Sequence, residues 1–166
     1  MKKMIKTAAT TIAMLSMTSQ SFAGGVCVRP AEALALKTAA VQQELMVAAL
    51  YCSDIRPYNN FVIAYRHDLQ DSDARLMSYF VRADGGHAGE ADYHAYKTSL
   101  ANNYSLEGSR HTDSYCATAQ AAFQEASNGN ESLHDFVMDQ PVSLKYDACD
   151  ERSGARESVA VPGGGE

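Results

Sequence analysis

Residues 30–52 read PAEALALKTAAVQQELMVAALYC. Apolar or small side chains recur along this stretch at intervals of four and three residues, which places them on one face of an α-helix. They are Leu34, Thr38, Val41, Leu45, Ala48 and Cys52, whereas Lys37, Gln42, Gln43 and Glu44 lie off this seam. A proline such as Pro30 is tolerated in a first helical turn. The stretch therefore predicts one helix with a narrow buried face, on which Cys52 is the last residue.

Turn signals divide the rest of the chain into further helical segments. Ser53 or Asp54 can cap a second helix that has Pro57 in its first turn, and the Gly85–Gly86 pair suits its end. We expect helices over residues 57–82 (one long helix, or two short ones separated near 71–73), 89–102 and 113–127, a polar loop over 104–112, a short helical turn over 132–138 and an extended segment over 142–146. The sequence thus predicts a mostly α-helical fold, a small disulfide-stapled bundle of about four helices.

The first 23 residues have the three-part pattern of a secretory signal peptide. Three lysines form a basic start, residues 7–17 form a short apolar core, and Ser21 and Ala23 supply the small side chains that precede a cleavage site. The alternative is an amphipathic helix that stays attached to the chain. We expect export, which makes the protein periplasmic or secreted.

The remaining chain divides into two parts. Residues 24–150 hold the helical segments and predict a single domain. Residues 151–166 lose apolar content and end in a glycine-rich run, which predicts a flexible, disordered C-terminal tail.

The charge of the chain limits its partners. The 166 residues include 14 basic and 20 acidic side chains, a net charge of −6. Because residues 1–23 hold three of the basic residues and none of the acidic ones, the mature chain carries −9. Phosphate contacts need clustered Lys and Arg, so nucleic acid is not expected as a partner. The sequence also lacks an apolar run of 18 residues, so we expect no transmembrane anchor.

Four cysteines in an exported chain predict two disulfides. Cys27 and Cys52 flank a helix about 33 Å long, and bridged Cα atoms lie within about 7 Å, so these two cannot pair. In an up-down bundle Cys52 and Cys116 fall at the same end, which favours the pairs Cys52–Cys116 and Cys27–Cys149. The alternative, Cys27–Cys116 with Cys52–Cys149, requires the fourth helix to start at the opposite end.

The residues His87, Glu90 and His94 form a candidate metal site. Glu90 and His94 are four residues apart and share a helix face, and imidazole and carboxylate groups can hold a transition metal such as zinc or copper. The pattern is not HExxH, and a further ligand must come from elsewhere. A solvated polar helix face explains the same residues, so no cofactor is required.

Motifs typical of catalysis are weak in this sequence. His67–Asp68 is similar to a general base with its orienting carboxylate, but adjacent residues on a helix point about 100° apart. The sequence contains no G-x-S-x-G, G-x-G-x-x-G, P-loop or C-x-x-C-H motif, which removes the usual signals for a serine hydrolase, nucleotide binding or c-type haem.

Tyrosine is the remaining compositional feature, with nine tyrosines against five phenylalanines. Tyrosine is common in binding surfaces, although it also packs at the edges of small cores with its hydroxyl in water. The group Tyr93, Tyr96 and Lys97 lies on the least apolar of the expected helices and is the candidate surface for binding.

These observations predict an exported, non-enzymatic binding or accessory module that acts through its surface on a protein or small ligand of the cell envelope. The alternatives are a periplasmic metal-binding protein that uses His87, Glu90 and His94, and a small hydrolase that uses His67 and Asp68.

Overall fold

The computed structural model describes residues 26–129 and 131–149. The helices of this part are α1 (Pro30–Tyr51), α2 (Arg56–Ala64), α3 (Arg66–Asp84), α4 (Gly86–Arg110), α5 (Thr112–Ser127) and α6 (Leu133–Asp139). The described residues form no strand, only an isolated parallel bridge between Val28 and Ala148. The mostly α-helical class is confirmed, with six helices in place of about four. The predicted signal peptide (1–23) and the predicted tail (151–166) lie outside the described residues.

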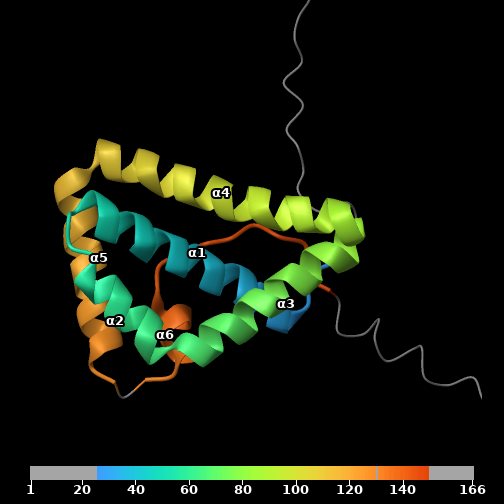
Figure 1. Cartoon of the computed structure of the whole chain (residues 1–166), viewed down its shortest axis with the longest axis horizontal. Helices are drawn as coiled ribbons and strands as arrows, with labels where there is room; N and C mark the ends of the chain where they lie inside the picture. Colours follow the sequence, from blue (N-terminus) through green and yellow to red (C-terminus); the bar gives the residue numbers. More distant parts are fainter. Residues whose placement is uncertain (1–25, 130, 150–166) are drawn as a thin grey trace, which may run out of the picture.

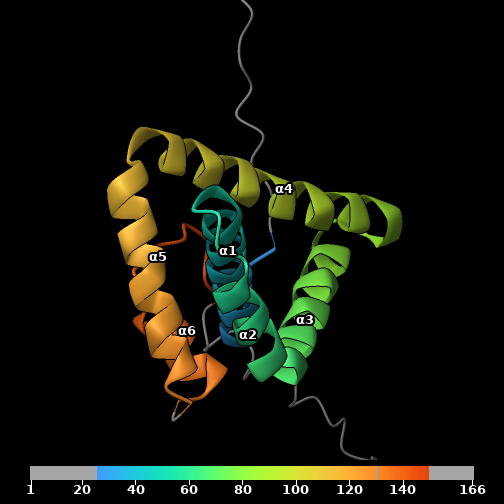
Figure 2. The same cartoon turned by 60° about the vertical axis from the view of Figure 1, so that its left-hand side comes forward.

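Helix α1 is the central element of the fold. Figures 1 and 2 show it passing through the middle of the molecule, with α4 along one side, α3 on another and α5 on a third. Its buried positions include Ala35, Leu36, Ala40, Gln43 and Val47 in addition to the expected seam. The prediction of one narrow buried face was therefore wrong. A helix that packs against neighbours on all sides buries residues around its whole circumference.

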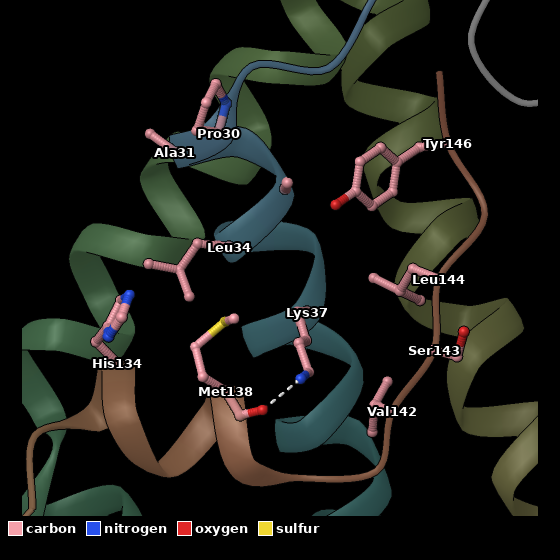
Figure 3. A pocket seen from close by; sticks show the side chains of 11 residues that line it. Pro30, Ala31, Leu34, Lys37, His134, Met138, Val142, Ser143, Leu144 and Tyr146 are labelled. Carbon is pink, nitrogen blue, oxygen red and sulfur yellow. Dashed lines mark hydrogen bonds between the residues drawn. The ribbon is translucent and has the colours of Figure 1, made fainter. Parts of the chain in front are cut away.

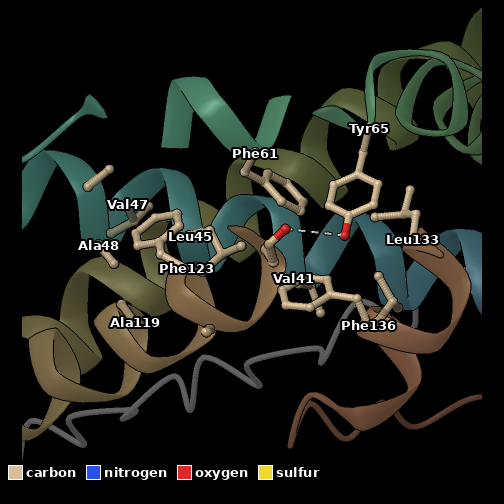
Figure 4. Packing of buried hydrophobic residues seen from close by; sticks show 14 of the residues in the cluster. Val41, Leu45, Val47, Ala48, Phe61, Tyr65, Ala119, Phe123, Leu133 and Phe136 are labelled. Atoms are coloured by element: carbon tan, nitrogen blue, oxygen red, sulfur yellow. Dashed lines mark hydrogen bonds between the residues drawn. The ribbon is translucent and has the colours of Figure 1, made fainter. Parts of the chain in front are cut away.

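Two clusters of buried side chains pack against opposite ends of α1. The cluster near its C-terminal half includes residues of α2, α5 and α6, and Phe136 at its centre is fully buried. The rings of Phe61 and Tyr65 lie 5.6 and 6.2 Å from the ring of Phe136, as Figure 4 shows. The other cluster joins the N-terminal half of α1 to α3 and α4.

The chain between residues 56 and 84 forms two helices that meet at Tyr65. Tyr65 has φ −105° and ψ 22°, outside helical geometry, and its ring is buried in the cluster shown in Figure 4. Its hydroxyl donates to the carbonyl oxygens of Glu131 (3.3 Å) and Ala126 (3.4 Å). The break was expected near residues 71–73, which instead lie inside α3. The break between α2 and α3 therefore lies at the buried Tyr65 and not at the polar residues 71–73.

Helix α4 is longer than predicted, because residues 104–110 of the expected loop over 104–112 form its last turns. Gly108 is buried there against the ring of Tyr115, where a Cβ atom would lie 3.1 Å from Tyr115 Cδ1. The glycine that suggested a helix end therefore allows α4 to pass close to α5. Tyr104 packs against both clusters, so its burial favours continuation of the helix.

Two disulfides close the fold with the favoured pairing. Cys52–Cys116 joins the end of α1 to α5, with Cα atoms 5.9 Å apart. Cys27–Cys149 joins the two ends of the described chain, with Cα atoms 4.7 Å apart. Beside it, Val28 N donates to Asp147 O (2.8 Å) and Cys149 N donates to Val28 O (2.9 Å). The extended residues 141–149, which we call the C-terminal strap, are thereby fixed to the start of the domain.

No helix in the described part of the chain is both long and apolar enough to cross a membrane.

Candidate functional site

The residues of the predicted metal site lie on the outer surface of α4. His87, Glu90 and His94 are all exposed, and the ring of His94 lies edge-on to the ring of Tyr93, with centroids 4.9 Å apart. Within residues 26–129 and 131–149, no group of three or more His, Cys, Asp or Glu side chains is close enough to hold a metal ion. The structure therefore does not bring a further ligand to this face of the helix.

His67 and Asp68, the predicted base and its partner, lie in the first turn of α3 and are both exposed. Among the hydrogen bonds that the structure describes, none joins one to the other. This agrees with the angle of about 100° between neighbouring helical side chains.

The predicted surface patch of Tyr93, Tyr96 and Lys97 is instead part of a joint between helices. Tyr93 is only 6% exposed, and its hydroxyl donates to the Asp73 carboxylate of α3 (2.7 Å). Lys97 Nζ donates to the same carboxylate (2.8 Å) and to Tyr93 Oη (3.1 Å). Tyr96 Oη donates to Leu36 O of α1 (3.2 Å), and burial raises the pKa of Tyr96. These side chains hold α4 against α3 and α1, and the use of this group as a binding surface stays a prediction.

Removal of the Tyr93 hydroxyl from this joint is expected to lower the stability of the protein moderately. Tyr93→Phe deletes a hydrogen bond to a carboxylate, and we expect the free energy of unfolding to fall by about 1–2 kcal/mol. Tyr51→Phe is the matched control, because the hydroxyl of Tyr51 has only a 3.5 Å contact with Thr112; its effect should stay within about 0.5 kcal/mol. Urea unfolding of both variants measures the difference, and equal midpoints would show that the Asp73 contact contributes nothing.

The structure contains an apolar groove that no sequence motif marked. It lies between the N-terminal half of α1, helix α6 and the C-terminal strap, and its volume is about 670 Å³. Figure 3 shows these three elements around it. The lining residues are Pro30, Ala31, Ala33, Leu34, Lys37, His134, Met138, Val142, Ser143, Leu144 and Tyr146. We call this surface the strap groove.

Residues within each lining element explain where that element begins, where it ends and what holds it in place. Pro30 starts α1, Ser132 caps α6 by accepting from Asp135 N (3.2 Å), and α6 is anchored by the fully buried Phe136 and Val137. Pro141 prevents α6 from continuing, since proline is not tolerated in a helix interior. The strap then leaves α6 and returns along α1 to the Cys27–Cys149 disulfide.

The polar side chains of the strap groove are few: Lys37, His134, Ser143 and Tyr146. Lys37 Nζ donates to Met138 O at the C-terminal end of α6 (2.9 Å), where helix carbonyls lack intrahelical partners. His134 Nδ1 lies 3.0 Å from the carboxylate of its neighbour Asp135. Hydrogen bonds from His134 and Ser132 lower the pKa of Asp135. None of the lining residues is acidic, although the chain as a whole is.

Two other hollows are more polar. The larger, about 790 Å³, surrounds the Cys52–Cys116 disulfide. Its lining includes Asp54, Asn60, Gln120, Gln124, Ser127 and Asn128. The smaller, about 500 Å³, is lined by Arg29, Glu32, Asp71 and Arg75 among others. Both surfaces suit water better than an apolar ligand, because a polar group that leaves water needs a new hydrogen-bond partner. The strap groove is therefore the better candidate site, although it is not the largest hollow.

Sequence reasoning missed the strap groove because its walls are distant in the chain. They come from residues 30–37, 134–138 and 142–146, and only the Cys27–Cys149 pair signalled that the last segment returns to the first. The sequence did predict the short helix and the extended segment, but not that they would face α1.

Comparison of the chain with protein families, with curated proteins and with solved structures found no match.

Proposed function

We propose that the chain is an exported, non-enzymatic binding module and that the strap groove is the surface through which it binds a small ligand of the cell envelope. The observation that carries this proposal is the mainly apolar groove of about 670 Å³. Small-molecule sites are typically 300–1,000 Å³, mostly apolar, with a few placed polar groups. Two lining side chains, Met138 and Tyr146, are 52% and 46% exposed. Both side chains are therefore accessible to a ligand that enters the groove.

The walls of the groove are held in place without a ligand. The strap is fixed at one end by the Cys27–Cys149 disulfide, and Val142 and Leu144 pack against the buried clusters along its length. Helix α6 is fixed by its buried face. A preformed site loses little conformational entropy on binding, which favours affinity.

A binding role is favoured over catalysis by the chemistry of the lining. Its side chains offer one amine, one imidazole and two hydroxyls among apolar groups. Among the hydrogen bonds described for these residues, none joins the hydroxyl of Ser143 or Tyr146 to His134. A nucleophile paired with a base is the usual mark of covalent catalysis, and the described contacts do not provide it.

The test is saturable binding of the neutral apolar dye N-phenyl-1-naphthylamine, followed by its fluorescence. We expect the purified, disulfide-bonded chain to bind the dye, and Met138→Glu to weaken binding at least tenfold, or about 1.4 kcal/mol, because it places a charge in an apolar site. Leu106→Glu is the matched control, since Leu106 on α4 is 54% exposed and outside the groove.

The proposal fails if the dye shows no saturable binding, or if Met138→Glu and Leu106→Glu bind it equally well. Far-UV circular dichroism of both variants verifies that they are folded.

A further inference from the structure

Lys37 provides an unneutralised charge in the strap groove. Its Nζ makes one hydrogen bond among the described residues, to Met138 O at 2.9 Å, and an ammonium group has three donors. The ion pairs found between described residues do not include Lys37. Two N–H groups of this amine are therefore available to an acceptor that enters the groove (Figure 3).

Two nearby carboxylates already have partners, and Asp139, which follows Met138 in the chain, does not line the groove. Glu32, on the same helix as Lys37, accepts from Arg82 Nε (3.1 Å) and from Arg29 N (2.8 Å). Asp135, on α6, accepts from Ser132 Oγ (2.7 Å) and lies beside His134. With no acidic residue in the lining, the local charge of the groove is positive in a chain of net charge −6. This favours an anionic group over a cationic one at Lys37.

The apolar walls of the groove are elongated. Residues 30–37 advance about 1.5 Å each along α1, a wall of about 10 Å. Residues 142–146 of the strap advance about 3.3 Å each, a wall of about 13 Å. Leu34 and Met138 line the groove from α1 and α6, and Leu144 and Tyr146 project from the strap (Figure 3). A narrow apolar body of similar length would cover these side chains.

We propose that the strap groove binds an acyl carboxylate, with its chain along α1 and the strap and its carboxylate on Lys37 Nζ. This inference rests on the proposed function and adds the chemical class of the ligand. An apolar chain in the groove removes water from the ammonium group, so a carboxylate partner becomes more valuable to it than in open solvent. A neutral head group leaves the amine without a counter-charge, and a cationic one repels it.

The experiment compares decanoate, decanol and decylammonium, which share one chain and differ in the head group. Each is titrated below its micelle concentration into the ¹⁵N-labelled, disulfide-bonded chain, and amide shifts of residues 30–37, 134–138 and 142–146 report binding. We expect decanoate to bind at least tenfold more tightly than the other two, with shifts confined to the groove. Octanoate should bind more weakly than decanoate, by about two- to fourfold for each missing methylene.

Two variants at Lys37 separate its charge from its hydrogen bond. Lys37→Gln keeps a donor for Met138 O without the charge, and should bind the three compounds within a factor of three of one another. Lys37→Arg keeps the charge and should retain the preference for decanoate. The inference is overturned if the wild type binds the three equally, or if Lys37→Gln keeps the preference. Equal binding leaves the proposed function intact, whereas the absence of shifts with every compound and with the dye overturns both.

Discussion

Replacement of both Cys27 and Cys149 by serine is expected to lower the free energy of unfolding by about 4–5 kcal/mol. The disulfide spans 122 residues, and the entropy that a crosslink removes from the unfolded chain grows with the length of the closed loop. Domains of this size have a total stability of about 5–15 kcal/mol, so the variant should be only marginally folded. Guanidinium unfolding of the oxidised wild type and of the variant measures the effect.

The matched control is the double serine variant of Cys52 and Cys116, whose disulfide spans 64 residues. Because this loop is shorter, the free energy of unfolding should fall by about 0.6 kcal/mol less than in the Cys27 and Cys149 variant. A larger difference is expected in ligand binding, because of the two disulfides only Cys27–Cys149 holds the C-terminal strap. Loss of that bond should abolish dye binding, whereas the control, where folded, should retain it. Retained binding after loss of Cys27–Cys149 would show that the strap is ordered without its disulfide.

Gly89→Ala is expected to destabilise the protein by about 3 kcal/mol, the upper range for overpacking. Gly89 lies where α4 crosses α3, and a Cβ atom there would approach the Phe80 carbonyl oxygen and lie 2.6 Å from Phe80 C and Val81 Cα. These are backbone atoms, so no side chain can rotate away. The two helices must separate, which disturbs the cluster that contains Phe80 and Tyr93.

Gly86→Ala provides the control on the same helix. A Cβ atom at Gly86 meets nothing within 4 Å, and alanine favours helix formation over glycine by about 1 kcal/mol. This variant should be neutral or slightly more stable. Urea unfolding of the two variants side by side isolates the close approach of the helices from helix propensity. Equal stabilities would show that α3 and α4 can separate at little cost.

The sequence allowed prediction of the elements that are set by local chemistry. Helix α1 begins at Pro30 as expected and ends at Tyr51, one residue before the expected limit. Both ends are set by residues close by in the chain, Pro30 in the first turn and Cys52 after the last. The disulfide pairing followed from helix length and direction, although the bundle has more elements than expected. By contrast, the ends of α4 and the break at Tyr65 depend on which side chains the core buries, and periodicity along one segment does not contain that information.

In the candidate site, too, contacts between distant parts of the chain could not be predicted from local sequence. Tyr93, Tyr96 and Lys97 are chemically suited to an exposed binding surface, yet Asp73 of α3 binds Tyr93 and Lys97, and Leu36 of α1 accepts from Tyr96. Lys37 lies off the expected α1 seam, yet it lines the strap groove together with residues of α6 and the strap. In both cases a partner distant in sequence determines the role of the residue.

The bond between Cys27 and Cys149 also has a mechanical consequence. Its Cα atoms lie 4.7 Å apart, and every helix of the described chain lies between the two cysteines. Tension applied to the backbone before Cys27 and after Cys149 is therefore carried by a covalent bond and not by the helices. The oxidised domain transmits a pulling force without being stretched, whereas its reduced form bears the full load through the packing of α1.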